Sequence, residues 1–225
     1  MNKKPTISVD VKDNASLMAN VANLYIKDGD VIADVTYGRG SFWNDIDTKR
    51  IKLIKSDIRP VKGIDFTADL RNLGFKNNSL DGLVLDPPYI HNPGNHQTDS
   101  RYGNAATTKG MYHRDIIELY RDGMVEAKRV LKVGGLLFVK CKDEVSGGLQ
   151  CYSLIELYDI ANELLFYPQD LFILVPTSRT TFNRWQRQIH ARKVHSYLWV
   201  FRSVEKMIRN REDRSEPARP RRIQK

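Results

Sequence analysis

Four short apolar segments in the first 90 residues each lead into an aspartate, and this series constrains the fold more than any other feature. The aspartates are Asp34, Asp57, Asp69 and Asp86. The carboxyl ends of parallel strands meet at one edge of a sheet, and open α/β sheets bind their ligands there. The series therefore predicts a parallel sheet with an acidic crevice along that edge.

The rest of the chain alternates between helical and strand patterns. Apolar spacing predicts helices over about 14–26, 114–131 and 153–165, and strands over 31–35, 51–56, 64–66, 81–86, 136–140, 171–175 and 196–201. The glycines at 134 and 135 predict a turn into the 136–140 strand. Strands that alternate with helices indicate an α/β fold with a doubly wound, mostly parallel, Rossmann-like sheet. The chain of 225 residues is long enough for one such domain, expected over 1–203.

The tetrapeptide Asp86-Pro87-Pro88-Tyr89 follows the apolar run 80–85. Its two prolines cannot continue a hydrogen-bonded ladder and fix a stiff, extended corner. Such a corner can hold a carboxylate, a backbone carbonyl and an aromatic ring in fixed relation. A planar ring that bears an amine needs these groups, as two acceptors for its N–H bonds and a face for stacking. The alternative is an ordinary proline-rich loop.

The segment Gly38-Arg39-Gly40 follows the first predicted strand. Glycines there allow positive φ and a close approach of the backbone to a ligand, whereas the alternative is a plain β-turn. Asp57 lies 23 positions after Asp34, a spacing that suits an acid accepting hydrogen bonds from ribose hydroxyls.

Together these segments resemble the class I S-adenosylmethionine-dependent methyltransferases, specifically the amino-methyltransferases of nucleic-acid bases. The resemblance spans about residues 10–202. It rests on Asp34-x-x-x-Gly38-x-Gly40, Asp57, Ala68-Asp69-Leu70-Arg71-Asn72-Leu73 and Asp86-Pro87-Pro88-Tyr89. It implies a sheet of seven mostly parallel strands, of which the last is antiparallel.

The resemblance also implies roles for individual residues. Gly38 and Gly40 would cradle the methionine part of the cofactor S-adenosyl-L-methionine, and Asp57 would hold its ribose. The cofactor-binding set is Asp34, Thr36, Tyr37, Gly38, Gly40, Phe42, Asp57, Ile58, Asp69 and Leu70, the last two facing the adenine. The catalytic set that takes the target amine is Asp86, Pro87, Pro88 and Tyr89.

The expected substrate is the N6 amine of adenine in DNA, because related N4-cytosine enzymes more often carry serine where this chain has Asp86. The first motif, with Val35-Thr36 where the DNA enzymes usually have proline-phenylalanine, also resembles some RNA methyltransferases. An RNA base methyltransferase is therefore one alternative, and a non-catalytic partner subunit is another. A small-molecule or protein N-methyltransferase is the third. Intact Gly38, Gly40 and Asp86 argue against the non-catalytic subunit.

The charge distribution favours nucleic acid as the partner. The net charge is +9, and between Asp170 and Glu205 the chain has no acidic residue. Basic residues interleaved with aromatic ones fit a phosphate-binding surface with stacking platforms. The predicted nucleic-acid-binding residues are Arg101, Arg179, Phe182, Arg184, Trp185, Arg187, Arg192 and Lys193. The alternative is that Trp185 packs under the sheet and the arginines are solvated.

Two further segments are expected to be irregular. The segment 90–113 begins at the proline corner and is interpreted as a lid over the cleft, with a plain surface loop as the alternative. The tail 204–225 is basic, contains two prolines and is expected to be disordered. It fits either a solubilising end or an arm that attracts phosphates.

Other classes of protein find no support in the sequence. The five histidines and two cysteines show no metal-binding spacing, and the cysteines are expected to be reduced thiols. No signal peptide or membrane-spanning apolar stretch is present, so a cytoplasmic protein is expected. The oligomeric state stays open between monomer and homodimer.

Overall fold

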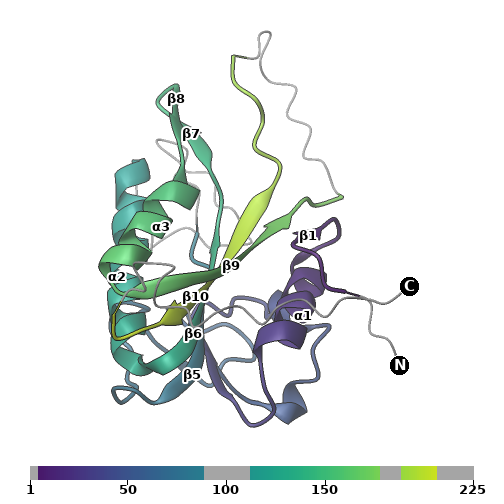
Figure 1. Cartoon of the computed structure of the whole chain (residues 1–225), viewed down its shortest axis with the longest axis vertical. Helices are drawn as coiled ribbons and strands as arrows, with labels where there is room; N and C mark the ends of the chain where they lie inside the picture. The colour runs from purple at the N-terminus through teal and green to yellow at the C-terminus, as the bar shows by residue number, and fades with distance from the viewer. Residues whose placement is uncertain (1–4, 89–111, 178–188, 207–225) are drawn as a thin grey trace, which may run out of the picture.

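The computed structural model describes residues 5–88, 112–177 and 189–206, which form an eight-stranded sheet with helices on both faces (Figure 1). The strand order is β4-β3-β2-β5-β6-β10-β9-β1. All neighbouring strands are parallel except that β10 is antiparallel to both β6 and β9. The predicted α/β, Rossmann-like sheet with an antiparallel last strand is confirmed.

The elements have the following bounds. The strands of the sheet are β1 (Val9–Asp10), β2 (Val31–Asp34), β3 (Lys52–Asp57), β4 (Phe66–Thr67), β5 (Leu80–Leu85), β6 (Leu131–Cys141), β9 (Phe166–Leu174) and β10 (Ser196–Ser203). A separate hairpin consists of β7 (Glu144–Ser146) and β8 (Leu149–Cys151). The helices are α1 (Asn14–Tyr25), α2 (His113–Val130) and α3 (Ser153–Glu163), with 3-10 turns at Ser41–Trp43 and Thr48–Arg50.

Three features differ from the sequence-based expectation. The sheet has an eighth strand, because β1 pairs with β9 at the edge, and the β7–β8 hairpin was not expected. The pair Gly134 and Gly135 is not a turn before the strand; it forms an irregularity within β6, where the partner of β5 shifts from Leu131 to Leu136.

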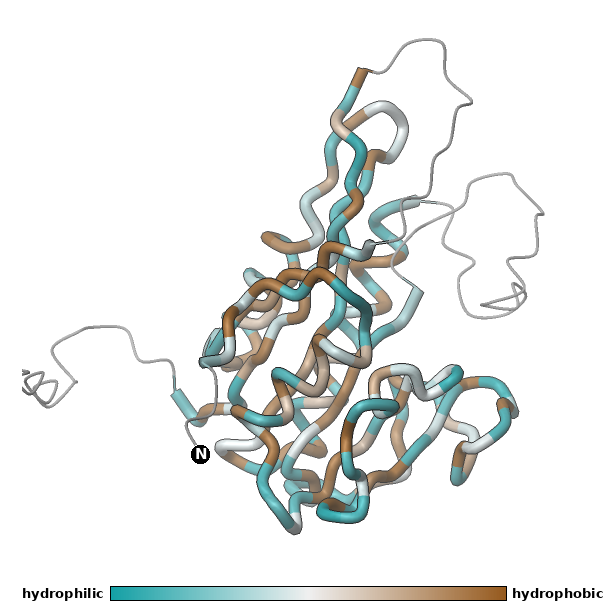
Figure 2. The backbone as a smooth tube through the Cα atoms, turned by 90° about the vertical axis from the view of Figure 1, so that its right-hand side faces the viewer, coloured by the Kyte–Doolittle hydropathy of each residue, from teal (hydrophilic) through white to brown (hydrophobic). Residues whose placement is uncertain are grey.

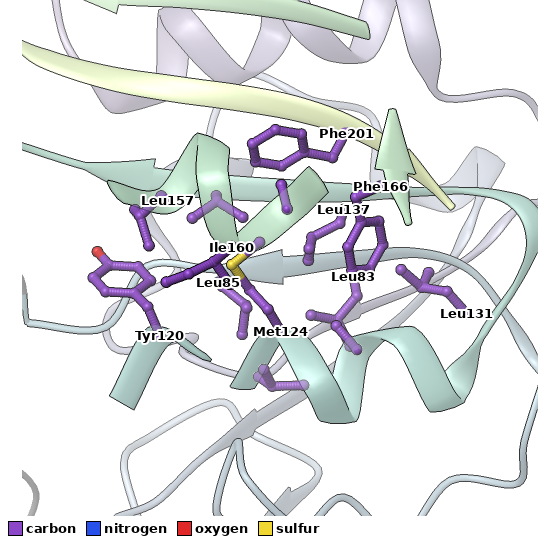
Figure 3. Close-up of a cluster of buried hydrophobic side chains, with 14 of the residues drawn as sticks. Leu83, Leu85, Tyr120, Met124, Leu131, Leu137, Leu157, Ile160, Phe166 and Phe201 are labelled. Carbon is purple, nitrogen blue, oxygen red and sulfur yellow. The ribbon is translucent and has the colours of Figure 1, made fainter. Parts of the chain in front are cut away.

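Each face of the sheet has its own hydrophobic core. Along β5, Val84 points to the α1 face, whereas Leu83 and Leu85 point to the face covered by α2 and α3. This alternation follows from the two-residue period of a strand. Figure 3 shows the α2–α3 core, in which Tyr120 of α2 and Phe201 of β10 are fully buried. Because neighbouring strands share the alternation, residues in register on β5 and β6 face the same helices.

Helix α2 holds the irregular link between β4 and β5 in place. Glu126 Oε1 accepts a hydrogen bond from the backbone N–H of Leu73 at 2.7 Å. Arg129 donates to the carbonyl oxygens of Leu73 and Phe75, each at 2.9 Å, and to both oxygens of Glu126. Glu126 and Arg129 thus provide hydrogen-bond partners for backbone groups that are not part of a helix or strand.

Figure 2 shows hydrophobic residues running through the central strands, while hydrophilic residues occupy many of the turns.

Cys141 is buried and Cys151 half-buried, and both are free thiols. Among the helices of the described ranges, none combines the length and the hydropathy needed to cross a membrane.

The start of α2 is tied to the hairpin and to α3 through His113. Its Nδ1 lies 2.7 Å from Glu144 Oε1, and its Nε2 lies 2.8 Å from Glu156 Oε1. Hydrogen bonds to these carboxylates, Glu144 first, outweigh burial and raise the pKa of His113 above its ordinary 6.5.

We expect this cluster to make folding stability depend on pH. A histidine with a raised pKa in the folded state contributes stability that is fully present below pH 6.5 and is lost as the pH rises through the folded pKa. Thermal melts between pH 6 and 9 should therefore show a falling melting temperature. The variant His113→Gln should show a flatter dependence, and equal slopes for both proteins would contradict the interpretation.

Candidate active site

The carboxyl ends of β2, β3 and β5 surround a cavity of about 270 Å³. It is lined by residues from all four predicted strand ends. The cavity-lining residues that the sequence had predicted as cofactor-binding or catalytic are Thr36, Tyr37, Gly38, Asp57, Ile58, Asp69, Leu70, Asp86, Pro87 and Pro88. A second, more open hollow of about 500 Å³ lies alongside and shares Tyr37 and Arg39. It contains no strand-end aspartate, and we therefore place the candidate active site in the first cavity.

The glycine turn after β2 is held by Asp57 at the end of β3. Asp57 Oδ2 accepts from the N–H of Gly38 at 3.0 Å, and its Oδ1 accepts from Arg59 N–H at 3.1 Å. Gly38 and Gly40 have φ angles of 52° and 69°, which side-chain-bearing residues rarely adopt. A Cβ on Gly40 would collide with the ring of Tyr37, so this glycine lets the ring lie against the turn.

Asp34 supports the turn from within the protein and does not line the cavity. It is buried, and its Oδ2 accepts from Trp43 Nε1 at 2.7 Å, while its Oδ1 accepts from Thr36 N–H at 3.1 Å. Burial raises the pKa of Asp34 to about 7, against the effect of these two hydrogen bonds. Phe42, also predicted at the cofactor, lies in the core under α1, and Gly40 lines the neighbouring hollow.

Asp69 and Leu70 form the wall of the cavity nearest α2. Asp69 makes a two-pronged ion pair with Arg71, whose Nη2 lies 2.6 Å from Oδ2, and these hydrogen bonds hold the pKa of Asp69 below its ordinary value. Leu70 packs so closely on Gly123 of α2 that a Cβ there would collide with it. The helix therefore fixes the position of the wall.

Asp86 lies immediately beyond β5, and its N–H donates to Thr36 Oγ1 at 2.7 Å. Its carboxylate oxygen Oδ1 is inaccessible to solvent and has no hydrogen-bond partner among the described residues. Burial raises the pKa of Asp86 to about 6, although Lys140 acts in the opposite direction. A buried acceptor without a partner is costly, and such groups are concentrated at functional sites.

Sequence reasoning missed several residues of the site. Asn14, Arg39, Arg59 and Leu119 line the cavity, and Lys140 lies buried beside it. The sequence placed Asn14 only at the start of the predicted helix 14–26, and in the structure it is the first residue of α1, with Asp13 as the N-cap. For Lys140 the signal was present, since it is a lysine at the end of the apolar run 136–139.

Several predicted residues lie outside the described ranges. They are Tyr89, Arg101, Arg179, Phe182, Arg184, Trp185 and Arg187, together with residues 90–111 of the predicted lid and most of the tail. Arg192 and Lys193 are described and lie in the segment leading into β10, next to the β7–β8 hairpin. Lys193 Nζ lies 5.6 Å from the ring centroid of Tyr152, and His190 Nε2 lies 2.9 Å from the carbonyl oxygen of Gly148.

The sequence matches no protein-family model and no curated protein, but the structure resembles several solved ones. An S-adenosylmethionine-dependent methyltransferase from Methanosarcina mazei has a TM-score of 0.53 at 13% identity, over 82% of this chain and 97% of that one. The 1,6-didemethyltoxoflavin-N1-methyltransferase of Burkholderia thailandensis, solved with its substrate and S-adenosylhomocysteine, has a TM-score of 0.56 at 11% identity, over 86% and 80%. A putative methyltransferase of Haloferax volcanii, solved with the Trm112 activator, gives 0.54 at 13%, over 84% and 90%.

These likenesses show the fold of this chain. It is that of the class I S-adenosylmethionine-dependent methyltransferases, as the sequence motifs predicted.

Proposed function

We propose that this protein is an S-adenosylmethionine-dependent methyltransferase acting on the exocyclic amine of a nucleic-acid base, and that the base is adenine in DNA, modified at N6. The observation that carries the proposal is the buried Asp86 carboxyl. The residue lines the cavity together with the glycine turn, and its oxygen Oδ1 is buried without a hydrogen-bond partner among the described residues.

The residues around the cavity suit S-adenosylmethionine. Gly38 presents backbone without a side chain, and both oxygens of Asp57 are already aligned by backbone N–H groups and keep lone pairs for ribose hydroxyls. Leu70 offers an apolar surface to the adenine and Asp69 an acceptor for its amine. When bound, S-adenosylmethionine supplies an electrophilic methyl group on a sulfonium.

The proline corner would prepare the target nitrogen for attack. Its lone pair is delocalised into the base, which makes it a poor nucleophile. Asp86 and the carbonyl oxygen of Pro87 would accept its two N–H bonds, which favours a pyramidal nitrogen whose lone pair points along the line of displacement. Asp86 is too weak a base to deprotonate the neutral amine. Acceleration therefore comes from positioning and electrostatics, and the proton leaves once the nitrogen is cationic.

Basic groups next to the β7–β8 hairpin support a nucleic-acid substrate. Arg192 is exposed and Lys193 half-buried next to the β7–β8 hairpin, whereas the hairpin's own acid, Glu144, is buried and bonded to His113. Arg192 and Lys193 thus place two positive charges in this region, which suit phosphates. A base inside a duplex must be extruded to reach Asp86, at a cost of about a few kcal/mol that stacking on Tyr89 would offset.

One experiment tests the proposal against its alternatives. The full chain is incubated with isotope-labelled S-adenosylmethionine and duplex DNA, single-stranded DNA or RNA, and the nucleosides are identified by mass spectrometry after digestion. Label in N6-methyladenine from DNA supports the proposal. Label only in RNA nucleosides replaces it by an RNA base methyltransferase, and binding without transfer replaces it by the non-catalytic subunit.

The glycine turn gives a separate prediction about the cofactor. We expect Gly40→Ala to lower the affinity for S-adenosylhomocysteine at least ~10-fold, because the added methyl displaces Tyr37 and strains the turn. The matched control is Gly29→Ala, which has a φ of 86° but meets no atom within 4 Å and lies in a turn away from the cavity. Isothermal titration calorimetry measures both, and an equal loss in the two variants would contradict the role of the turn.

A further inference from the structure

Lys140 is a buried lysine at the end of β6, and its side chain has no assigned role in the chemistry above. The residue is 1% exposed, which is rare for lysine. Burial lowers its pKa, and the nearby Asp86 carboxyl acts in the opposite direction. An ammonium group taken out of water at this depth is costly unless it meets an acceptor or a negative charge.

The register of the sheet brings Lys140 to the side of Asp86. Val84 of β5 pairs with Phe138 of β6, and both side chains belong to the core under α1. Leu85 and Val139 pair next and face the other way. Continuing the two-residue alternation by one step puts Asp86 and Lys140 on the α1 face, on neighbouring strands that lie about 5 Å apart.

Contacts on three sides fix the lysine in this position. Its Nζ donates to Asn14 Oδ1 at 2.8 Å, at the first residue of α1, and lies 5.9 Å from the ring centroid of Phe42. The carbonyl oxygen of Lys140 accepts from Tyr120 Oη at 2.6 Å, from the opposite face of the sheet. The end of β6 is therefore held by both helix layers, and the ammonium stays near the cavity wall that Asn14 lines.

The other titratable groups in this region set the electrostatic balance at Asp86. Asp34 and Asp86 repel each other, so the Asp34 carboxyl opposes a negative charge on Asp86, and Asp57 in turn repels Asp34. Cys141 faces the α2–α3 core, where burial raises the pKa of its thiol well above the ordinary range, and it carries no charge. Lys142 repels Lys140. Lys140 is the cation that acts on Asp86 within the described part of the chain.

We infer that Lys140 is a positioning residue which keeps the Asp86 carboxyl ionised, so that the carboxylate can accept hydrogen bonds from the target amine. The inference rests on the proposed function, because it assigns Lys140 to the same reaction. An ionised carboxyl is needed there, since a protonated one would present an O–H to the N–H bonds it has to accept. An arginine could serve in place of the lysine, whereas an uncharged isostere could not.

The test compares pH–rate profiles of wild type, Lys140→Met and Lys140→Arg under single-turnover conditions. Loss of an adjacent opposite charge shifts a carboxyl by about one to three pKa units. We therefore expect the acidic limb of Lys140→Met to move up by at least ~1 unit from about pH 6, with at least ~2-fold lower transfer at pH 7 and recovery toward wild type at pH 9. Lys140→Arg should restore the wild-type limb. An unmoved limb in Lys140→Met, or an equal loss at every pH, would overturn the inference.

Two further variants separate this role from a structural one. Lys142→Met makes the same change two residues along, at a lysine that does not act on Asp86, and should keep the wild-type limb. Asn14→Ala keeps the lysine and removes the hydrogen bond from its ammonium to Asn14, so the acidic limb should shift in the same direction by less. This variant also tests the inference if Lys140→Met does not fold, because an unshifted limb in Asn14→Ala counts against it.

A substrate-free measurement distinguishes failure of the inference from failure of the proposed function. The titration of the Asp86 carboxyl is followed by carbon-13 NMR in wild type and in Lys140→Met, with Asp86→Asn used to assign the signal. A higher midpoint in Lys140→Met supports the electrostatic role even if the nucleic-acid assays are negative. Equal midpoints overturn it even if base methylation is found.

Discussion

Asp86→Asn should lower methyl transfer at least ~100-fold and leave the affinity for S-adenosylhomocysteine unchanged. The amide cannot supply the negative charge that favours a pyramidal, developing cationic nitrogen, and losses of this size follow removal of one preorganised electrostatic partner. Asp86 contributes to the cavity wall, but the predicted cofactor contacts come from Gly38, Asp57 and Leu70. Single-turnover kinetics and calorimetry measure the two quantities, and parallel losses in both would mean that the role given to Asp86 is wrong.

The same substitution should not destabilise the protein at pH 8. Burial raises the pKa of Asp86 from the ordinary 3.8 to about 6, so between these values the folded state holds a proton that the unfolded state has released. Stability contributed by this group is therefore lost as the pH rises from about 4 to 6, and above pH 6 the ionised carboxylate costs free energy. We expect Asp86→Asn to melt at or above the wild-type temperature at pH 8 in scanning calorimetry.

Glu126→Ala should lower the free energy of unfolding by about 3 kcal/mol. The substitution leaves the N–H of Leu73 without its acceptor and leaves Arg129 without its carboxylate partner, in a region where Glu126 itself is buried. Urea denaturation measures the change.

The matched control for that substitution is Glu118→Ala on the same helix. Glu118 is 65% exposed, and its contact with Arg114 at 3.6 Å is a surface pair, so we expect a change within about 0.5 kcal/mol. Equal effects of the two substitutions would show that helix propensity, and not the link to residues 68–79, determines the loss.

The sequence predicted the edge of the sheet well because one residue type marks it. Each short apolar run ends in an aspartate, and three of the four aspartates line one cavity. Helices α1, α2 and α3 begin and end within two residues of their predicted positions, because apolar spacing reports directly on the face that is buried.

Features that depend on distant parts of the chain could not be predicted in this way. The two residues of β1 are a strand only because β9 offers its edge to them. Asp34 resembles its neighbours in sequence, but the indole N–H of Trp43, nine residues later, turns it inward as a buried support.

The wall of Leu70 depends on α2 for its position, and this dependence reaches beyond the cavity itself. Glu126 and Arg129 do not line the cavity, yet they hold the backbone from Leu73 to Phe75 and so the residues just before it. Because these hydrogen bonds go to backbone atoms, they do not depend on the side chains of residues 73 and 75. We therefore expect substitutions at Glu126 or Arg129 to change the affinity for S-adenosylmethionine, although neither residue lines the cavity.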